Sequence, residues 1–142
     1  MPTRGRGRQI LVDTSVAVAL SVADHDQHKR TAEALTGKVL GLSGHAAFES
    51  FSVLTRLPAP ARRDAATVAA LLARNFPASR FLSAEATGAL VDELATLRIA
   101  GGAVYDALVG ACANEHDLVL ATRDRRALET YRALDVEIDF IA

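Results

Sequence analysis

Short apolar runs that alternate with longer helical segments are the feature that most constrains how this chain can fold. The runs at residues 10–12, 39–42 and 118–122 are rich in Val, Ile and Leu, which favours β-strands. Apolar residues recur at helical spacing between the runs. Strands that are joined through helices lie parallel, and the helices then cover both faces of the sheet. The alternation therefore predicts an α/β fold, a three-layer α/β/α sandwich around a small, mainly parallel sheet.

Punctuating glycines and prolines divide the rest of the chain into further elements. Pro58 and Pro60 end one helical pattern, Pro77 ends the next, and the Gly101-Gly102 pair separates the last two long helices. Two more strands are expected, at residues 80–83 and 136–141. Helices are expected at residues 16–22, 26–35, 45–57, 61–75, 84–97, 103–115 and 125–134.

The length of 142 residues corresponds to one domain, since domains usually have about 100–200 residues. Alternating Arg and Gly at residues 1–8 predict a flexible basic arm, which leaves residues 9–142 as a single domain. No apolar run approaches the roughly 20 residues of a membrane span. The start does not resemble a secretory signal, and the single cysteine, Cys112, cannot form an internal disulfide. We therefore expect a cytoplasmic protein without a membrane partner, with Cys112 as a small buried side chain.

Two acidic residues follow strands at the place where folds of this kind bind ligands. Asp13 comes directly after the run at 10–12, and Asp124 lies two residues past Thr122. Because the carboxyl ends of parallel strands meet at one edge of the sheet, both acids are expected there. Taken singly, each is also a common helix-capping or turn residue.

Two further acids are expected to point inward from helices. Asp106 has small and apolar neighbours at helical spacing, so it lies on the apolar stripe of its helix, where a lone carboxylate is costly. Glu49 lies four residues after His45 on a face that also carries apolar residues. For Glu49 alone, a solvated side chain or a pair with Arg56 is an equally good interpretation.

If Asp13, Glu49, Asp106 and Asp124 converge, their repulsion raises the pKa of at least one carboxyl unless a cation occupies the site. Oxygen ligands without cysteine or paired histidine suit Mg²⁺ (or Mn²⁺) better than zinc. Such an ion keeps waters available and polarises phosphoryl oxygens. The four acids therefore predict a metal site that hydrolyses phosphodiester bonds.

The same residues resemble the PIN domain family, and within it the VapC-type toxins. The likeness runs from Gln9 to Ile141 and lies in the order of four motifs. These are Val12-Asp13-Thr14-Ser15, the segment 48–57 around Glu49, Tyr105-Asp106, and Leu120-Ala121-Thr122-Arg123-Asp124. All four acids of the family pattern are present.

The resemblance implies a PIN-like fold and an Mg²⁺- or Mn²⁺-dependent endoribonuclease that cuts RNA as the toxin of a type II toxin–antitoxin pair. It also implies a homodimer and a small cognate VapB-like antitoxin that places a C-terminal segment in the acidic pocket. At the matching positions, Asp13, Glu49 and Asp106 are expected to be catalytic metal ligands. Asp124 is expected to be the fourth, holding water or a second ion.

Three neighbours of the acids are candidates for supporting roles. The hydroxyls of Ser15 and Thr122 are placed to orient a carboxylate or a water, with helix capping as the alternative. Arg123 is a candidate phosphate contact, with a solvated or Asp-paired side chain as the alternative.

Binding of RNA must rely on local basic clusters, because 16 Lys and Arg against 17 Asp and Glu leave a net charge of −1. The candidate clusters are Arg62-Arg63, Arg123 with Arg125-Arg126, and the arm with Arg4, Arg6 and Arg8. Aromatic residues make up only 5% of the chain, which does not support base stacking on a broad platform.

Two other functions are also compatible with the sequence. One is a PIN-like module that binds RNA or protein with little or no catalysis, and the other is an RNA-processing nuclease outside a toxin pair. Two other α/β enzyme classes are disfavoured. A haloacid-dehalogenase phosphatase would need an acid where Ser15 stands. A nucleotide-dependent kinase or GTPase would need a glycine-rich phosphate loop, which the sequence lacks.

Overall fold

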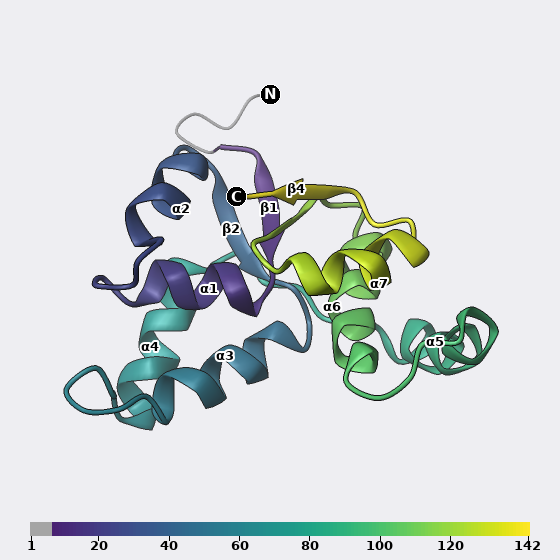
Figure 1. Ribbon diagram of the computed structural model, residues 1–142, viewed down its shortest axis with the longest axis horizontal. Helices are drawn as coiled ribbons and strands as arrows, with labels where there is room; N and C mark the ends of the chain where they lie inside the picture. The colour runs from purple at the N-terminus through teal and green to yellow at the C-terminus, as the bar shows by residue number, and fades with distance from the viewer. Residues whose placement is uncertain (1–6) are drawn as a thin grey trace.

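The computed structural model describes residues 7–142 as a parallel sheet between two layers of helices (Figure 1). Along the chain the elements are β1 (Gln9–Val12), α1 (Thr14–Ser21), α2 (His28–Ala34), β2 (Val39–Leu42), α3 (Ala46–Thr55), α4 (Ala65–Asn75), α5 (Ala84–Leu97), α6 (Ala103–Glu115), β3 (Leu120–Thr122), the 3₁₀ turn η1 (Arg125–Ala127), α7 (Leu128–Ala133) and β4 (Ile138–Phe140). The predicted α/β/α sandwich is confirmed. Most of the predicted basic arm, residues 1–6, lies outside the described residues. Arg8 already pairs with the sheet, because its carbonyl accepts from the Val39 N–H.

Strand order places β1 at the centre of the sheet. The order is β2-β1-β3-β4, and all three pairings are parallel. The chain therefore leaves β1 toward one side to form β2 and returns on the other side to form β3. Val12, the last residue of β1, is level with Leu42 of β2 and Ala121 of β3, so the three strands end together. Ligands bind in the crevice at such a switch in strand order, just beyond the carboxyl ends of the strands.

Alternating side chains send the central strand into two separate cores. Ile10 and Val12 pack with residues of α1, α3 and α4, whereas Leu11 packs with residues of α5, α6 and α7. In Figure 1 the first group of helices lies on one side of the sheet and the second group on the other, with α5 projecting at the edge of the molecule. Because successive residues of a strand face opposite ways, a four-residue strand is enough to anchor both helical layers.

Several predicted boundaries move by a few residues because of capping. Helix α4 begins at Ala65 rather than 61, since Asp64 in extended conformation accepts a hydrogen bond from the Thr67 N–H. The single helix predicted over residues 125–134 divides into η1 and α7. Helices α5 and α6 begin and end as predicted.

The strand predicted at residues 80–83 is wrong. Ala78 and Arg80 donate backbone hydrogen bonds to Leu40 and Leu42 of β2, but only an isolated bridge between Ser43 and Arg80 forms. The chain then turns away, because Ser83 caps the start of α5. The apolar residues at 81 and 82 are therefore in a connection between α4 and α5.

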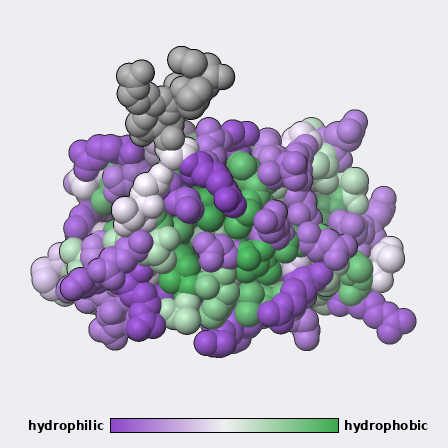
Figure 2. All heavy atoms as spheres, turned by 90° about the horizontal axis from the view of Figure 1, so that it is seen from above, coloured by the Kyte–Doolittle hydropathy of each residue, from purple (hydrophilic) through white to green (hydrophobic). Residues whose placement is uncertain are grey.

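The surface includes both polar and apolar regions. Figure 2 views the molecule from the side on which β1 begins and shows apolar side chains gathered in the middle of that face, framed by polar ones. Apolar atoms contribute more than half of an ordinary protein surface, so this patch needs no special explanation. In residues 7–142 no helix has the length and apolar character needed to cross a bilayer. Cys112 is buried, as predicted.

We expect Gly41→Ala to destabilise the protein by about 1–3 kcal/mol, the usual cost of overpacking. A Cβ at this position in β2 would lie 2.2 Å from the Ala78 carbonyl oxygen, a backbone atom that cannot move aside cheaply. The matched control is Gly88→Ala within α5, where a Cβ meets nothing within 4 Å. That control should raise stability by about 0.5–1 kcal/mol through its helix propensity. Urea denaturation of both variants tests the close approach, and an unchanged Gly41→Ala midpoint would contradict it.

Candidate active site

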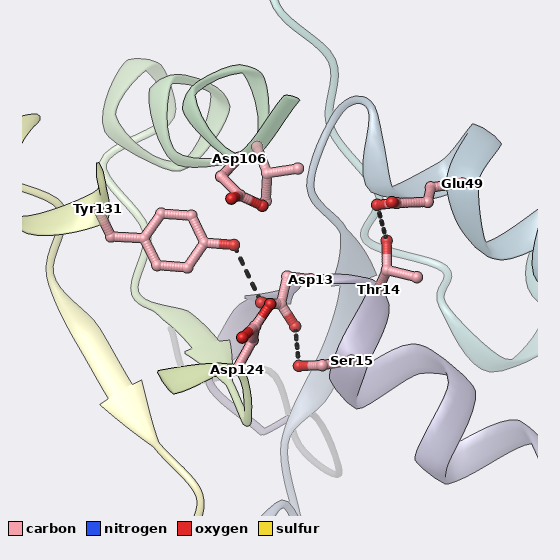
Figure 3. Close-up of a pocket in the computed structure, with 8 residues that line it drawn as sticks. Asp13, Thr14, Ser15, Glu49, Asp106, Asp124 and Tyr131 are labelled. Atoms are coloured by element: carbon pink, nitrogen blue, oxygen red, sulfur yellow. Dashed lines mark hydrogen bonds between the residues drawn. The ribbon is translucent and has the colours of Figure 1, made fainter. Parts of the chain in front are cut away.

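A cavity of about 220 Å³ opens at the carboxyl edge of the sheet, where β1 and β3 end. It is lined by Asp13, Thr14, Ser15, Glu49, Asp106, Val109, Asp124 and Tyr131 (Figure 3). All four acids singled out in the sequence are among these residues, although they come from four separate segments of the chain. The structure thus brings together the acidic side chains that the sequence places up to 111 residues apart, from Asp13 to Asp124.

Asp13 is the most enclosed of the four acids, with 4% of its surface exposed. Its Oδ1 accepts from the Ser15 hydroxyl at 2.6 Å and from the Val16 N–H at 3.3 Å. Its Oδ2 accepts from the Thr122 hydroxyl at 2.5 Å and from the Tyr131 hydroxyl at 3.0 Å. Burial raises the pKa of Asp13 above its usual value, and these hydrogen bonds oppose that rise. Asp13 therefore both caps α1 and faces the cavity, so the two interpretations of this residue are compatible.

The hydroxyls of Ser15 and Thr122 connect Asp13 to the loop that carries Asp124. Ser15 Oγ donates to Asp13 and accepts from the Arg123 N–H at 2.9 Å. Thr122 Oγ1 donates to Asp13 and accepts from the Asp124 N–H at 3.0 Å. Each hydroxyl thus uses its donor and an acceptor position to hold β1 and β3 in register at their carboxyl ends. This geometry suits the predicted orienting role, which itself stays a prediction.

Asp124 lies beside Asp13 in Figure 3. Its Oδ1 accepts from the Arg126 N–H at 3.0 Å and caps η1. The Arg126 Nε lies 3.7 Å from the same oxygen, but the Arg126 side chain is exposed and the pair is screened by water. As with Asp13, the capping residue and the cavity residue are the same side chain.

Asp106 reports how strongly the acids affect one another. Its pKa rises to about 6, first because it is partly desolvated and then because Asp124, Glu49 and Asp13 repel its charge. The exposed Arg126 offsets this only in part. The apolar stripe recognised in the sequence thus does direct Asp106 toward the other carboxylates, where ionisation is disfavoured in the absence of a cation.

Glu49 is held at the rim of the cavity by a residue that sequence analysis missed. Its Oε1 accepts from the Thr14 hydroxyl at 2.6 Å, and Glu49 itself is exposed (Figure 3). The alternative pair with Arg56 is not formed, because no carboxylate in residues 7–142 lies within salt-bridge distance of Arg56. Thr14 directly follows Asp13, so its place in the motif was the available signal.

The donor set suits a hard divalent cation such as Mg²⁺ or Mn²⁺ by the chemistry of its oxygen ligands. Four carboxylates face one cavity, no sulfur or imidazole lines it, and Asp106 is destabilised in its charged form by the other three. As the side chains stand, no three His, Cys, Asp or Glu residues in the described part of the chain are arranged to hold an ion. The Thr14 bond to Glu49 and the four donors on Asp13 explain this, since they keep the carboxylates directed to protein partners. The residues therefore fit a metal by chemistry and position, with rotation of carboxylates on loading.

Arg123 and Tyr131 are two further residues to place relative to the cavity. Arg123 is not among the lining residues, and its Nε is buried with no hydrogen-bond partner in the described structure. A phosphate contact by Arg123 remains a prediction. Tyr131 was missed by sequence analysis, because it lies on α7 in a segment without a motif and meets Asp13 only through tertiary packing.

We expect Asp106→Asn to stabilise the metal-free protein at pH 7 by about 1 kcal/mol, after discounting the shift for the partial exposure of Asp106. The folded protein keeps the Asp106 proton up to pH of about 6, whereas the unfolded chain releases it near 3.8. Folding therefore binds a proton between these values, and the free energy of unfolding falls as pH rises through this window. Asparagine removes this dependence, so the gain should vanish near pH 4.

Urea denaturation in EDTA at several pH values between 4 and 7 measures this difference. Asp92→Asn, at an exposed position of α5, is the matched control and should follow the wild type. Equal stabilities of wild type and Asp106→Asn at pH 7 would contradict the raised pKa of Asp106, which burial and then the neighbouring acids cause.

We expect Tyr131→Phe to lower the free energy of unfolding by about 1–3 kcal/mol, because it removes a buried donor from the Asp13 carboxylate and keeps the ring. Thermal denaturation monitored by circular dichroism measures the loss. Tyr105→Phe removes a hydroxyl from an exposed ring and serves as the control. An identical melting temperature for Tyr131→Phe and wild type would show that the hydroxyl contributes nothing.

Comparison with known proteins identifies the family. Residues 10–133 match the PIN domain family. The chain is 44% identical over 129 residues to Ribonuclease VapC27 of Mycobacterium tuberculosis. This alignment covers 91% of this chain and 94% of the relative. It is also 44% identical over 134 residues to Ribonuclease VapC40 of the same organism, covering 93% and 98%.

Solved structures agree with this assignment at the level of the fold. The crystal structure of DNA-bound VapBC from Salmonella typhimurium matches with a TM-score of 0.67 and 20% identity over 95% of this chain and 99% of that one. VapBC2 from Rickettsia felis, bound to a DNA fragment from its promoter, matches with a TM-score of 0.66 and 16% identity, covering 93% and 98%. The sheet order, the four acids at its carboxyl edge and these relatives lead to one conclusion: the chain belongs to the PIN domain family and is of the VapC type.

Proposed function

We propose that this protein is an endoribonuclease that hydrolyses RNA phosphodiester bonds with the help of Mg²⁺ or Mn²⁺. The observation that carries the proposal is the convergence of Asp13, Glu49, Asp106 and Asp124 on one cavity. The support from relatives is the 44% identity, over nine-tenths of the chain, to proteins named ribonucleases.

The four carboxylates would hold the ion, each with a different degree of constraint. Asp13 accepts from four donors, so it is the most constrained of the four and would have to release one donor to contact the ion directly. Asp106 and Asp124 are half-buried; in Figure 3 Asp124 lies beside Asp13 and Asp106 approaches from α6. The exposed Glu49 would leave Thr14 and turn inward. When bound, the ion would activate a water and offset charge on the phosphate. The hydroxyls of Ser15 and Thr122 would keep Asp13 in place while the substrate binds.

The charge of the acidic cavity supports the proposed requirement for a cation. A phosphodiester would enter a cavity lined by four carboxylates with no arginine or lysine among the lining residues. Repulsion between these charges in a partly desolvated site opposes binding of the backbone. A bound divalent ion would offset part of this repulsion and give a phosphate oxygen a direct contact, so substrate binding and cleavage are expected to depend on the same ion.

We further propose that the protein acts as the toxin of a type II pair, forms a homodimer and is neutralised by a VapB-like antitoxin. The support is the family and the fold, since the solved VapBC structures from Salmonella typhimurium and Rickettsia felis resemble this chain. A small preceding gene that encodes a DNA-binding protein would favour a toxin over an RNA-processing nuclease. Growth arrest on expression of the chain, relieved by that gene, would establish the pair.

We expect the purified chain, free of any antitoxin, to cleave single-stranded or loop RNA with Mg²⁺ or Mn²⁺ and to stop in EDTA. Asp106→Asn should reduce cleavage by roughly 100-fold or more, because even changes outside the ligand set of a metal site cost about 10–100-fold. Gel analysis of a labelled oligoribonucleotide measures cleavage, and calorimetric titration with Mn²⁺ measures metal binding independently. Asp92→Asn is the matched control.

The outcomes separate the proposal from its alternatives. Cleavage that persists in EDTA would refute the role of the metal, and full activity of Asp106→Asn would place the chemistry elsewhere. RNA binding without metal-dependent products would instead support a binding module that lacks catalysis.

A further inference from the structure

A second hollow, lined by aromatic and basic side chains, adjoins the acidic cavity. It has a volume of about 350 Å³ and is lined by His45, Phe48, Glu49, Ser52, Arg56 and Tyr105. Glu49 lines both hollows, so they meet at this residue. We refer to the second hollow as the aromatic groove.

The rings of the aromatic groove are attached to the helices that carry the acids. Tyr105 immediately precedes Asp106 on α6, and His45 lies one turn before Glu49 at the start of α3. The two rings stack with centroids 5.1 Å apart and an interplanar angle of 27°. Because α3 and α6 set both the acids and the rings, the distance between the ring pair and the cavity is fixed by the fold.

Tyr105 remains open to solvent although it stacks on His45, and so does Phe48, whose ring is tilted against that of Phe81. Tyr105 is 54% exposed and Phe48 66% exposed, which places both among the few large apolar side chains of the described residues that are not covered. The side chain of Tyr105 therefore offers ring surface beyond the part that His45 contacts. Planar rings with free surface stack on nucleobases of any identity, since every base has a π-face.

The groove is lined by one carboxylate, Glu49, and one arginine, Arg56, and the arginine offers a contact that a nucleotide phosphate can use and an apolar protein segment cannot. Arg56 lines it at the C-terminal end of α3 and has no carboxylate within salt-bridge distance in the described chain. A guanidinium in this position can pair with a phosphate while a base covers the rings. The acidic cavity next to it has no such cation among its lining residues.

We propose that the aromatic groove is a nucleotide subsite, in which a base next to the scissile phosphate of single-stranded RNA stacks on Tyr105 and a neighbouring phosphate contacts Arg56. This inference rests on the proposed ribonuclease function and adds a substrate requirement to it. A base inside a duplex is already stacked and cannot cover Tyr105, so the subsite selects unpaired RNA. Tyr105 is a binding and positioning residue that does not take part in the chemistry.

The experiment is a double-mutant cycle that removes the Tyr105 ring and the RNA base separately and together. Fluorescence anisotropy measures binding of a labelled single-stranded oligoribonucleotide in Mg²⁺, with a non-hydrolysable analogue at the scissile phosphate so that the RNA stays intact and all four carboxylates stay in place. Tyr105→Ala should raise Kd roughly 10-fold, within the range known for loss of one stacked base. An abasic nucleotide at one position next to the cleavage site should weaken binding to the wild-type protein by a similar factor. The same abasic nucleotide should have little further effect in Tyr105→Ala, because the effects of two groups that contact each other are not additive.

Two variants separate stacking from other effects of the substitution. Tyr105→Phe should restore the affinity lost in Tyr105→Ala, since it returns the ring without the hydroxyl. Val91→Ala truncates a side chain on α5 that is 64% exposed and should leave Kd unchanged. Arg56→Gln should weaken binding and make it less dependent on salt, by about one phosphate contact. In the wild-type background, cleavage kinetics should show a larger effect of Tyr105→Ala on KM than on kcat.

Each result has a defined meaning. If the wild type cuts RNA but Tyr105→Ala binds and cuts with unchanged constants, the subsite is refuted and the ribonuclease proposal survives. If ring and abasic effects simply add, or if Tyr105→Phe fails to restore binding, stacking is refuted. If Tyr105→Ala leaves RNA binding intact but dissociates the protein in size-exclusion chromatography, the groove contacts a second copy of the chain. If the wild type cuts no RNA with either metal, both proposals fall together.

Discussion

Burial of the Asp13 carboxylate at the end of the central strand is the constraint on which the rest of the site depends. A carboxylate removed from water is stable only if hydrogen-bond donors or a cation replace the lost hydration. Three side-chain hydroxyls and one backbone N–H meet both oxygens of Asp13. These donors come from α1, β3 and α7, so satisfying one charged group ties three separate parts of the chain together.

This arrangement also explains how the protein tolerates the other three acids before a metal binds. Asp124 and Glu49 each accept a hydrogen bond from a nearby donor, the Arg126 N–H and the Thr14 hydroxyl. Burial and the remaining repulsion raise the pKa of Asp106 to about 6. This repulsion acts on a half-buried side chain that lines the cavity, where a bound cation would relieve it. Structural capping and the proposed catalysis thus use the same carboxylates at different stages.

The two hollows at the carboxyl edge have complementary chemistry. The acidic cavity suits a cation and a phosphate that follows it, while the aromatic groove presents rings and Arg56. They adjoin because Glu49 of α3 lines both hollows and Tyr105 immediately precedes Asp106 on α6. The composition of the chain, with 5% aromatic residues, argued against a broad stacking platform. A subsite for one base needs only the two or three rings that tertiary packing brings to one place.

Much of the architecture was determined by the sequence alone, because it depends on local patterns. Short Val- and Leu-rich runs between helical segments require parallel strands with helices on both faces, and Asp13 and Asp124 follow two of those strands. The inward position of Asp106 likewise followed from its neighbours at helical spacing. What the tertiary structure decided were contacts between residues far apart in sequence, for which no local pattern exists. Such contacts set the strand order and removed the strand expected at 80–83. They also include the hydrogen bond from Tyr131 to Asp13 across 118 residues, the hydrogen bond from Thr14 to Glu49 and the stacking of Tyr105 on His45. Periodicity reports which way a side chain faces within its own element, whereas the partner it meets is chosen by the packing of the whole chain.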